Sequence, residues 1–253
     1  MGINYTGSGK EAIELEFSKD SAKKRVAEYG INTPSYFVAK PGIYKTADEL
    51  PVSFPLFIKP LREGDGKGIG IDSIIYDFES YQNRVQSIYT SFKQSALVEK
   101  YLIGREFTVS VLGSASNNEL ITMPVEITFP GKKSHERILG YETKKENREM
   151  VIAIDNEDIF KSVASIAKRS FQALGARDFG RIDIFMDEND CPYFIEANLV
   201  PGMTQRPNDI DSSHFPRACF INSHITYQET VQRIAEIAFN RLEGRLIHER
   251  VAS

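Results

Sequence analysis

The chain has 253 residues, 41% hydrophobic and 26% charged, which is long enough for one large domain or two modest domains with a real core. With 31 basic and 35 acidic residues, its formal net charge is −4, so no overall positive field favours binding to nucleic acid or to an anionic membrane. Local basic pairs, such as Lys132-Lys133, are either phosphate sites or part of a solvated face.

The cysteines and histidines of the chain do not indicate disulfide bonds or a zinc site. Cys191 and Cys219 do not form a CxxC pair, and the four histidines lack the spacing of zinc ligands. Residues 1–20 lack the basic and apolar regions of a signal peptide, and no stretch approaches the roughly 20 apolar residues of a membrane span. A soluble cytoplasmic protein is therefore predicted.

In chain order, short strand-like segments alternate with helical ones, and Gly and Pro separate them. The predicted helices are 21–29, 78–92, 158–174 and 227–242. The predicted strands that precede residue 158 are 35–38, 55–60, 96–101 and 106–112. Strand pairs joined by turns, with helices between them, favour an α+β fold with antiparallel sheets over a doubly wound parallel fold.

Residues 181–204 carry the strongest functional signal in the chain. Two alternating stretches flank the turn-forming cluster 188–192, which predicts a β-hairpin. We expect the turn to be centred between Asn189 and Asp190.

This turn would bring four polar side chains together on one face of the hairpin. Asp183 would lie opposite Glu196, and Arg181 opposite Asn198, with Glu196 and Asn198 on the same face because they are two residues apart. Oxygen ligands in this arrangement suit Mg²⁺, and Mg²⁺ in turn suggests a nucleoside triphosphate. The alternative is a solvated face with a chance cross-strand ion pair.

A glycine-dense loop at 64–70 follows the apolar strand that carries Lys59. Glycines let the backbone approach a phosphate closely and aim several N–H groups at it, although such loops also occur as plain surface turns. The loop does not match a Walker A sequence. Lys59 must either extend its ammonium group to water or meet an anion.

Glu99 and Glu106 lie on either side of a short connection between strands. Acidic residues at such positions accept hydrogen bonds from an adenine amino group or from ribose hydroxyls, but they also protect edge strands from aggregation. No Ser-His-Asp arrangement or nucleophilic cysteine is recognisable in the sequence.

Together these segments resemble the ATP-grasp superfamily and, within it, the D-alanine–D-alanine ligase branch. The match follows the family's order through Tyr5-Thr6-Gly7-Ser8-Gly9, Gly30-Ile31-Asn32-Thr33-Pro34, Phe57-Ile58-Lys59-Pro60, the glycine loop, 99–108 and 181–204. The last segment is the most specific, because Arg-x-Asp followed by Glu-x-Asn-x-x-Pro-Gly-Met-Thr is hard to reach by chance.

The resemblance implies a role for each matching residue. The metal ligands would be Asp183, Glu196 and Asn198, holding a pair of Mg²⁺ ions, with Mn²⁺ as an alternative. The ATP-binding residues would be Lys59, Gly66, Lys67, Gly68, Glu99, Lys100, Tyr101, Leu102, Glu106 and Lys144, with both lysines 59 and 144 on the phosphates, 99–102 on adenine and Glu106 on the ribose. The catalytic groups would be Arg181, Lys144 and the Gly202 N–H, with Arg181 and Gly202 stabilising the tetrahedral intermediate.

The implied fold consists of two α+β subdomains whose antiparallel sheets grip ATP between them. Residues 1–20 would be a remnant of an N-terminal segment, 21–98 the small subdomain with the glycine-rich loop, and 99–253 the large subdomain with the metal site.

The chain departs from the ligase branch in three places. Asp65-Gly66 stands where a pair of serines is usual, which favours a substrate other than D-alanine, and the stretch 205–213 is longer than usual. Family members carry an N-terminal domain before the segment that begins at Tyr5, but only four residues precede it here. Either the chain is a fragment, or a partner chain or homo-oligomer supplies that domain, or the substrate site differs.

The implied reaction is ADP-forming ligation of a carboxylate to an amine, with amino acids as substrates and an acyl phosphate as the intermediate. Three hypotheses follow: a ligase for D-alanine or a related amino acid, an ATP-grasp ligase for another acid and amine, and a truncated chain that binds Mg-ATP without turnover.

Overall fold

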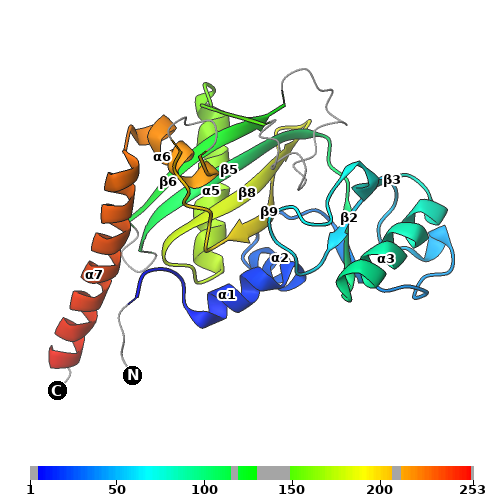
Figure 1. Cartoon of the computed structure of the whole chain (residues 1–253), viewed down its shortest axis with the longest axis horizontal. Coiled ribbons are helices and arrows are strands. Elements are labelled where there is room, and N and C mark those ends of the chain that lie inside the picture. Colours follow the sequence, from blue (N-terminus) through cyan, green and yellow to red (C-terminus); the bar gives the residue numbers. More distant parts are fainter. Residues whose placement is uncertain (1–4, 115–118, 130–148, 207–211, 252–253) are drawn as a thin grey trace.

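The computed structural model describes residues 5–114, 119–129, 149–206 and 212–251, and these form two antiparallel sheets with helices packed around them (Figure 1). The predicted α+β class with antiparallel sheets is confirmed. None of the helices in the described ranges is long and apolar enough to cross a membrane.

The larger sheet has five strands in the order β7-β6-β5-β8-β9. Its strands are β5 (Gly104–Ser114), β6 (Glu119–Thr128), β7 (Met150–Ile152), β8 (Asp178–Asp187) and β9 (Pro192–Asn198). Alternate residues of β5 and β8, such as Val109 and Ile182, enter one core with α5 (Glu157–Ala173). On the opposite face, Met123 and Val125 of β6 pack against α6 (His214–Ser223) and α7 (Tyr227–Val251). The sheet is therefore covered on both faces (Figure 1).

The smaller sheet has four strands in the order β1-β4-β2-β3. Its strands are β1 (Tyr36–Ala39), β2 (Leu56–Pro60), β3 (Ile74–Ile75) and β4 (Ala96–Lys100). The helix α3 (Phe78–Phe92) packs on it through Tyr81, Val85 and Ile88, which form a separate core with strand residues such as Ile58 and Val98. Two short 3-10 helices, η1 (Ala47–Glu49) and η2 (Ile71–Ser73), lie in its connections.

Local sequence signals explain where the long helices begin. The Asp77 side chain accepts the Ser80 N–H at the start of α3, and Asn156 accepts the N–H groups of Asp158 and Ile159 at the start of α5. The predicted helix 78–92 is confirmed at both ends, whereas α5 begins and ends one residue earlier than predicted.

Several elements were not predicted. They are α1 (Lys10–Phe17), β3, β6, β7 and α6, and α2 (Lys19–Glu28) starts before the predicted residue 21. α2 has a strongly polar composition, so its helical pattern is weak, and tertiary packing rather than an apolar stripe decides where it lies.

The N-terminal helices belong to the core of the larger sheet. Ala12 of α1 and Ala22 and Val26 of α2 lie in the same buried cluster as α5 and β8. The three-part division at 1–20, 21–98 and 99–253 stays a prediction, and this packing shows only that α1 and α2 lie against the larger sheet.

A buried ion pair fastens the segment before α1. Arg241 of α7 donates to both carboxylate oxygens of Asp178 at 2.9 Å and to the Tyr5 carbonyl at 2.8 Å. Asp178 also accepts the Gly7 N–H at 2.8 Å. Residues near the two ends of the chain are thus joined at the start of β8 (Figure 1).

Residues 101–103 carry the chain from β4 in the smaller sheet to β5 in the larger one. Glu99 and Glu106, predicted to bracket a strand connection, therefore lie on different sheets that meet at this linker. Most of the predicted site residues in the described ranges lie at this junction.

Candidate functional site

The hairpin of β8 and β9 has the predicted register at its functional end. Arg181 pairs with Asn198, and Asp183 pairs with Glu196. Toward the turn the register shifts by one residue, so that Ile184 pairs with Phe194 and Ile195 is the extra residue of a β-bulge. The pairs next to the turn are therefore centred on Asn189 rather than between Asn189 and Asp190, as predicted. The extra residue of the bulge compensates for this shift, so that the pairs at Arg181 and Asp183 are the predicted ones.

Asp183 is the centre of a hydrogen-bonded group on this face. Arg181 donates to its two carboxylate oxygens, both at 2.9 Å, and Asn198 donates to it at 3.1 Å. From the neighbouring strand β5, the Thr108 hydroxyl donates to Asp183 at 2.6 Å. Burial alone would lower the pKa of Arg181, but the negative charges of Asp183 and Glu196 outweigh the effect of burial and raise this pKa.

The donor set of this face fits a hard divalent cation. In the described part of the chain, no cluster of three or more His, Cys, Asp or Glu side chains is placed to hold a metal ion. The oxygen donors would therefore be two carboxylates and the Asn198 amide, which are ligands of the kind Mg²⁺ takes beside water and phosphate oxygens.

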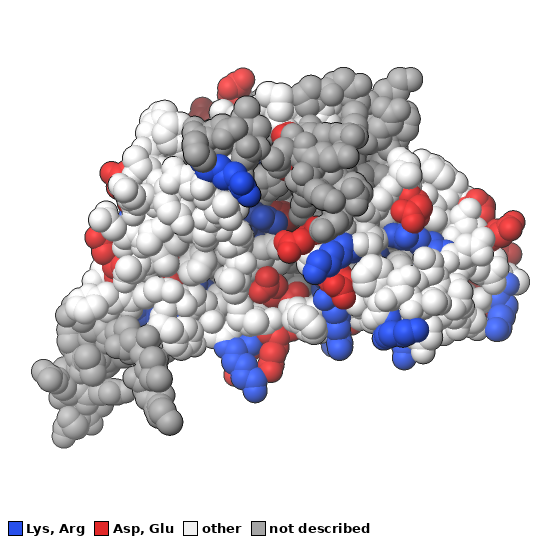
Figure 2. Space-filling model, in the orientation of Figure 1, with Lys and Arg blue, Asp and Glu red and all other residues white. Residues whose placement is uncertain are grey.

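A cavity opens where the two sheets meet, and charged side chains of both signs gather there on the molecular surface (Figure 2). Its lining combines the smaller sheet, the linker and the larger sheet. Nine predicted site residues line it: Lys59, Gly66, Glu99, Lys100, Tyr101, Leu102, Glu106 and the two carboxylates of the metal trio, Asp183 and Glu196.

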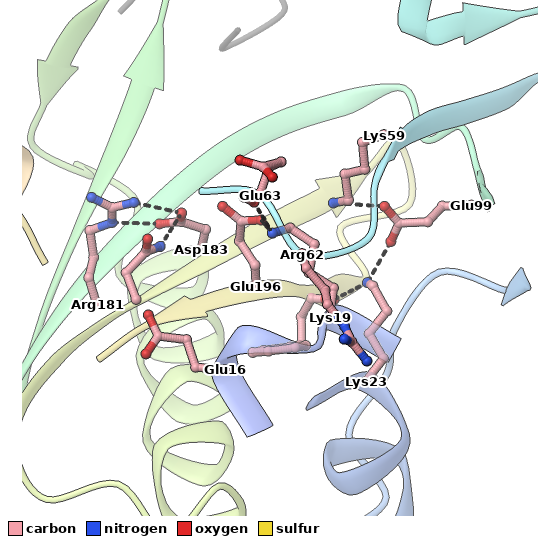
Figure 3. Close-up of polar contacts among 12 residues, drawn as sticks. Glu16, Lys19, Lys23, Lys59, Arg62, Glu63, Glu99, Arg181, Asp183 and Glu196 are labelled. Carbon is pink, nitrogen blue, oxygen red and sulfur yellow. Dashed lines mark hydrogen bonds and ion pairs between the residues drawn. The ribbon is translucent and has the colours of Figure 1, made fainter. Parts of the chain in front are cut away.

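Lys59 meets an anion, which is one of the two possibilities that its position in an apolar strand left open. Its ammonium group lies 2.8 Å from one oxygen of Glu99, and the other oxygen of Glu99 lies 2.6 Å from Lys23 of α2 (Figure 3). Burial alone would raise the pKa of Glu99, but the charges of Lys23 and Lys59 lower it to about 2. Burial lowers the pKa of Lys23 to about 8 against the opposing charge of Glu99, whereas the pKa of Lys59 is raised because the nearby carboxylates outweigh its burial.

Two further residues from the N-terminal helices, Lys19 and Glu16, come from the side of β9 that carries Glu196 (Figure 3). Lys19 lies 3.6 Å from the Glu196 carboxylate and donates to the Glu63 carbonyl beside the glycine loop. Glu16 accepts the Leu199 N–H at 3.0 Å, just beyond β9. Burial raises the pKa of Glu16, and the charge of Glu196 adds to this rise.

The glycine loop is held against the smaller sheet by α3. Arg84 of α3 donates to the Gly68 carbonyl and to the Ser73 hydroxyl and pairs with Asp72. Gly68 has a φ of +70°, and a Cβ there would lie 2.7 Å from Pro60 Cγ. Glycine is thus required at this point of the loop.

The other predicted residues within the described ranges do not line the cavity. Arg181 and Asn198 are joined to the cavity through their hydrogen bonds to Asp183, and Lys67 is exposed on the loop. Gly202 lies beside Ser213, the residue before α6, where a Cβ would be 2.9 Å from Ser213 Oγ. Lys144 lies outside the described residues.

Sequence reasoning missed Lys19, Lys23, Glu16 and Thr108. The two lysines are four residues apart and so share one face of α2, a spacing that could have marked them. Thr108 stands opposite Asp183 in the register of β5 and β8, which only strand pairing reveals.

A comparison with known protein families identifies the family of this chain. The family described as D-ala D-ala ligase C-terminus matches residues 26–236, which include both sheets and the hairpin. The chain belongs to this family.

Relatives within the D-Ala–D-Ala ligase family are identical to this chain at about a third of the aligned positions. The chain is 32% identical over 209 residues to the D-alanine–D-alanine ligase of Bordetella petrii, covering 81% of this chain and 60% of that enzyme. It is 30% identical over 256 residues to the ligase of Carboxydothermus hydrogenoformans, covering 97% of this chain and 75% of that enzyme. The chain thus spans less than two thirds of the Bordetella petrii enzyme.

The fold agrees with solved ligases of the family. The D-alanine–D-alanine ligase of Bacillus anthracis, in a crystal structure described as complexed with ATP, superposes with a TM-score of 0.74 at 22% identity. The match covers 96% of this chain and 73% of that one. The ATP-grasp fold is therefore confirmed.

Proposed function

We propose that this chain is an ATP-dependent, ADP-forming carboxylate–amine ligase of the D-alanine–D-alanine ligase type. The observation that carries the proposal is the cavity at the junction of the sheets, which brings Lys59 together with Asp183 and Glu196. A fixed positive charge and a pair of carboxylates within one cavity suit a magnesium-bound triphosphate. Membership of the ligase family supports the same reaction class.

The reaction requires two displacements. A carboxylate oxygen of the first substrate attacks the γ-phosphorus of ATP, the bond to the bridging oxygen breaks, and ADP leaves with that electron pair. The amine of the second substrate then attacks the acyl carbon and loses a proton, and inorganic phosphate leaves as the amide forms. No enzyme nucleophile is needed, in agreement with the sequence.

Residues of the chain would act on these steps through position and charge. Bound Mg²⁺ would neutralise charge on the phosphates as it moves. Lys59 would hold the phosphates, the loop 64–70 would exclude water from the acyl phosphate, and Arg181 would stabilise the oxyanion of the tetrahedral intermediate. The Gly202 N–H and Lys144 complete the proposed catalytic set.

The second candidate is a ligase for an acid or amine other than D-alanine. Asp65 of the glycine loop has a φ of +55°, and its charge is among those that raise the pKa of Arg181, after that of Asp183. A carboxylate whose charge acts on Arg181 would change which substrate is accepted at the proposed oxyanion site. The cytoplasmic location and the pair of metal ions are part of the proposal in either case.

The decisive experiment measures Mg²⁺-dependent ADP release by the purified chain with and without D-alanine, alongside ATP binding. ADP and a dipeptide formed only with D-alanine would establish the first candidate. ATP binding with ADP release only for other amino acids would establish the second. Binding without any turnover would identify a nucleotide-binding chain and refute the ligase, and absence of ATP binding would refute both candidates.

A further inference from the structure

A buried triad links the two sheets beside the nucleotide cavity. Lys23 comes from α2, which packs in the core of the larger sheet, while Lys59 and Glu99 lie on β2 and β4 of the smaller sheet. All three residues are at most 3% exposed. Glu99 lies between the two ammonium groups, one on each carboxylate oxygen (Figure 3).

Lys23 has no access to the cavity of its own. It is fully buried, donates to the Thr33 hydroxyl at 2.9 Å and to the Phe194 carbonyl at 3.5 Å, and lies 5.9 Å from the ring centroids of Tyr36 and Phe194. It does not line the cavity, whereas Lys59 and Glu99 do. Lys23 therefore acts on a ligand without touching it, through its charge and its ion pair with Glu99.

The charges of the triad decide what Lys59 can offer to a ligand. Two ammonium groups and one carboxylate leave a net positive charge, but Lys59 and Glu99 alone would form a neutral pair. A neutral pair attracts a polyanion far less than a cation does. Charges at this depth are only weakly screened by solvent, so the difference reaches the cavity.

We propose that Lys23 is a positioning residue that neutralises Glu99 and so keeps the positive charge of Lys59 available to the phosphates of a nucleotide. The inference rests on the proposed function, since it assumes that the cavity binds ATP. It assigns a role to a helix that the sequence does not connect with the site. It also explains why a lysine is buried in α2, where an apolar residue would cost less.

The test compares two ligands that differ only in phosphate. Mg-ATP and adenosine are titrated calorimetrically into the full chain, into Lys23→Met and into the control Lys24→Met, whose side chain is exposed one residue away on the same helix. A loss of one charge at this distance is expected to weaken ATP binding about tenfold, with adenosine binding unchanged. Lys24→Met should match the wild type with both ligands.

A rescue variant separates charge from packing. Lys23→Met/Glu99→Gln removes both buried charges and returns the net charge of the triad to that of the wild type. The ratio of ATP to adenosine affinity should therefore recover to within about threefold of the wild-type ratio. Because Glu99 lines the cavity, the ratio rather than either affinity is the quantity compared.

The outcomes are distinct. The inference is refuted if Lys23→Met leaves the ratio of ATP to adenosine affinity unchanged, including the case in which it weakens the binding of both ligands equally. It is also refuted if the ratio in the double variant is further from the wild-type ratio than in Lys23→Met. In these cases Lys23 would only support packing. If Lys23→Met does not fold, Lys23→Gln takes its place, because glutamine keeps a polar partner for Thr33. The same ratio of ATP to adenosine affinity is then measured. Failure of the wild type to bind Mg-ATP would instead refute the proposed function.

Discussion

Phe194 and Glu196 are two residues apart in β9 but lie on opposite faces of the larger sheet. Phe194 is fully buried in the core under α5, while Glu196 lines the cavity opposite Asp183. In a regular strand, residues two apart share a face. The bulge at Ile195 supplies the extra residue that turns the strand over, so one strand contributes both to the core and to the site.

The carboxylates on this face should control magnesium-dependent binding. Asp183→Asn and Glu196→Gln each remove a charged oxygen ligand, and each should weaken ATP binding in the presence of Mg²⁺ by about 10- to 100-fold. Calorimetric titration with and without Mg²⁺ measures the effect. Glu188→Gln, an exposed change at the tip of the same hairpin, is the matched control, and an equal loss in all three variants would contradict the metal assignment.

The glycine loop offers a matched pair of substitutions. Gly68→Ala places a Cβ 2.7 Å from Pro60 Cγ at a residue whose φ is +70°, so the loop must move. Gly64→Ala meets nothing within 4 Å. We expect Gly68→Ala to lower the unfolding free energy by about 1–3 kcal/mol and to raise the Kd for ATP, with Gly64→Ala close to wild type. Denaturant unfolding and ATP titration of both variants provide the measurement, and similar behaviour of the two would rule out this role of Gly68.

The pH dependence of stability should report on Glu99. Its pKa is about 2 in the folded chain and 4.5 when unperturbed, so the unfolded state binds more protons between these values. The stabilisation is therefore present above about pH 4.5 and is lost as the pH falls toward 2, by up to about 1.4 kcal/mol per pH unit.

Urea unfolding of the wild type and Glu99→Gln from pH 7 to pH 3 tests this directly. Other carboxyl groups, such as Asp77 and Asp187, also have lowered pKa values, so the comparison uses the difference between the two proteins. The difference in unfolding free energy should shrink as the pH falls below about 4.5. A constant difference would mean that Glu99 does not titrate with folding.

The ion pair between Asp178 and Arg241 should anchor α7 and the segment at Tyr5. Asp178 is fully buried, so Arg241→Met leaves an uncompensated charge and should lower the unfolding free energy by about 3–5 kcal/mol. Arg25→Met, which breaks an exposed pair with Glu28, should cost less than about 1 kcal/mol. Thermal and urea unfolding measure the loss of unfolding free energy in both variants. If Arg241→Met loses no more than Arg25→Met, the ion pair contributes little to anchoring α7.

The sequence determined the elements and residues whose signals are local. The helix 78–92 follows from its Asp77 cap and its apolar stripe, and the hairpin from alternation around a turn-forming cluster. The pairing of Asp183 with Glu196 followed from residue counting because β-strands repeat every two residues. Motif resemblance added the remaining site residues and the family, and the sheets and the comparisons confirmed the fold.

Only the tertiary structure decided which distant residues complete the site. Lys23 and Lys19 lie on a polar helix with no motif, and Thr108 reaches Asp183 through strand pairing. The bulge at Ile195 is equally invisible, since an extra residue in a strand has no signature of its own. These contacts depend on burial and on the meeting of two sheets. A buried charge is tolerated only where the fold supplies its partner, and the order of residues along the chain does not reveal which partner that will be.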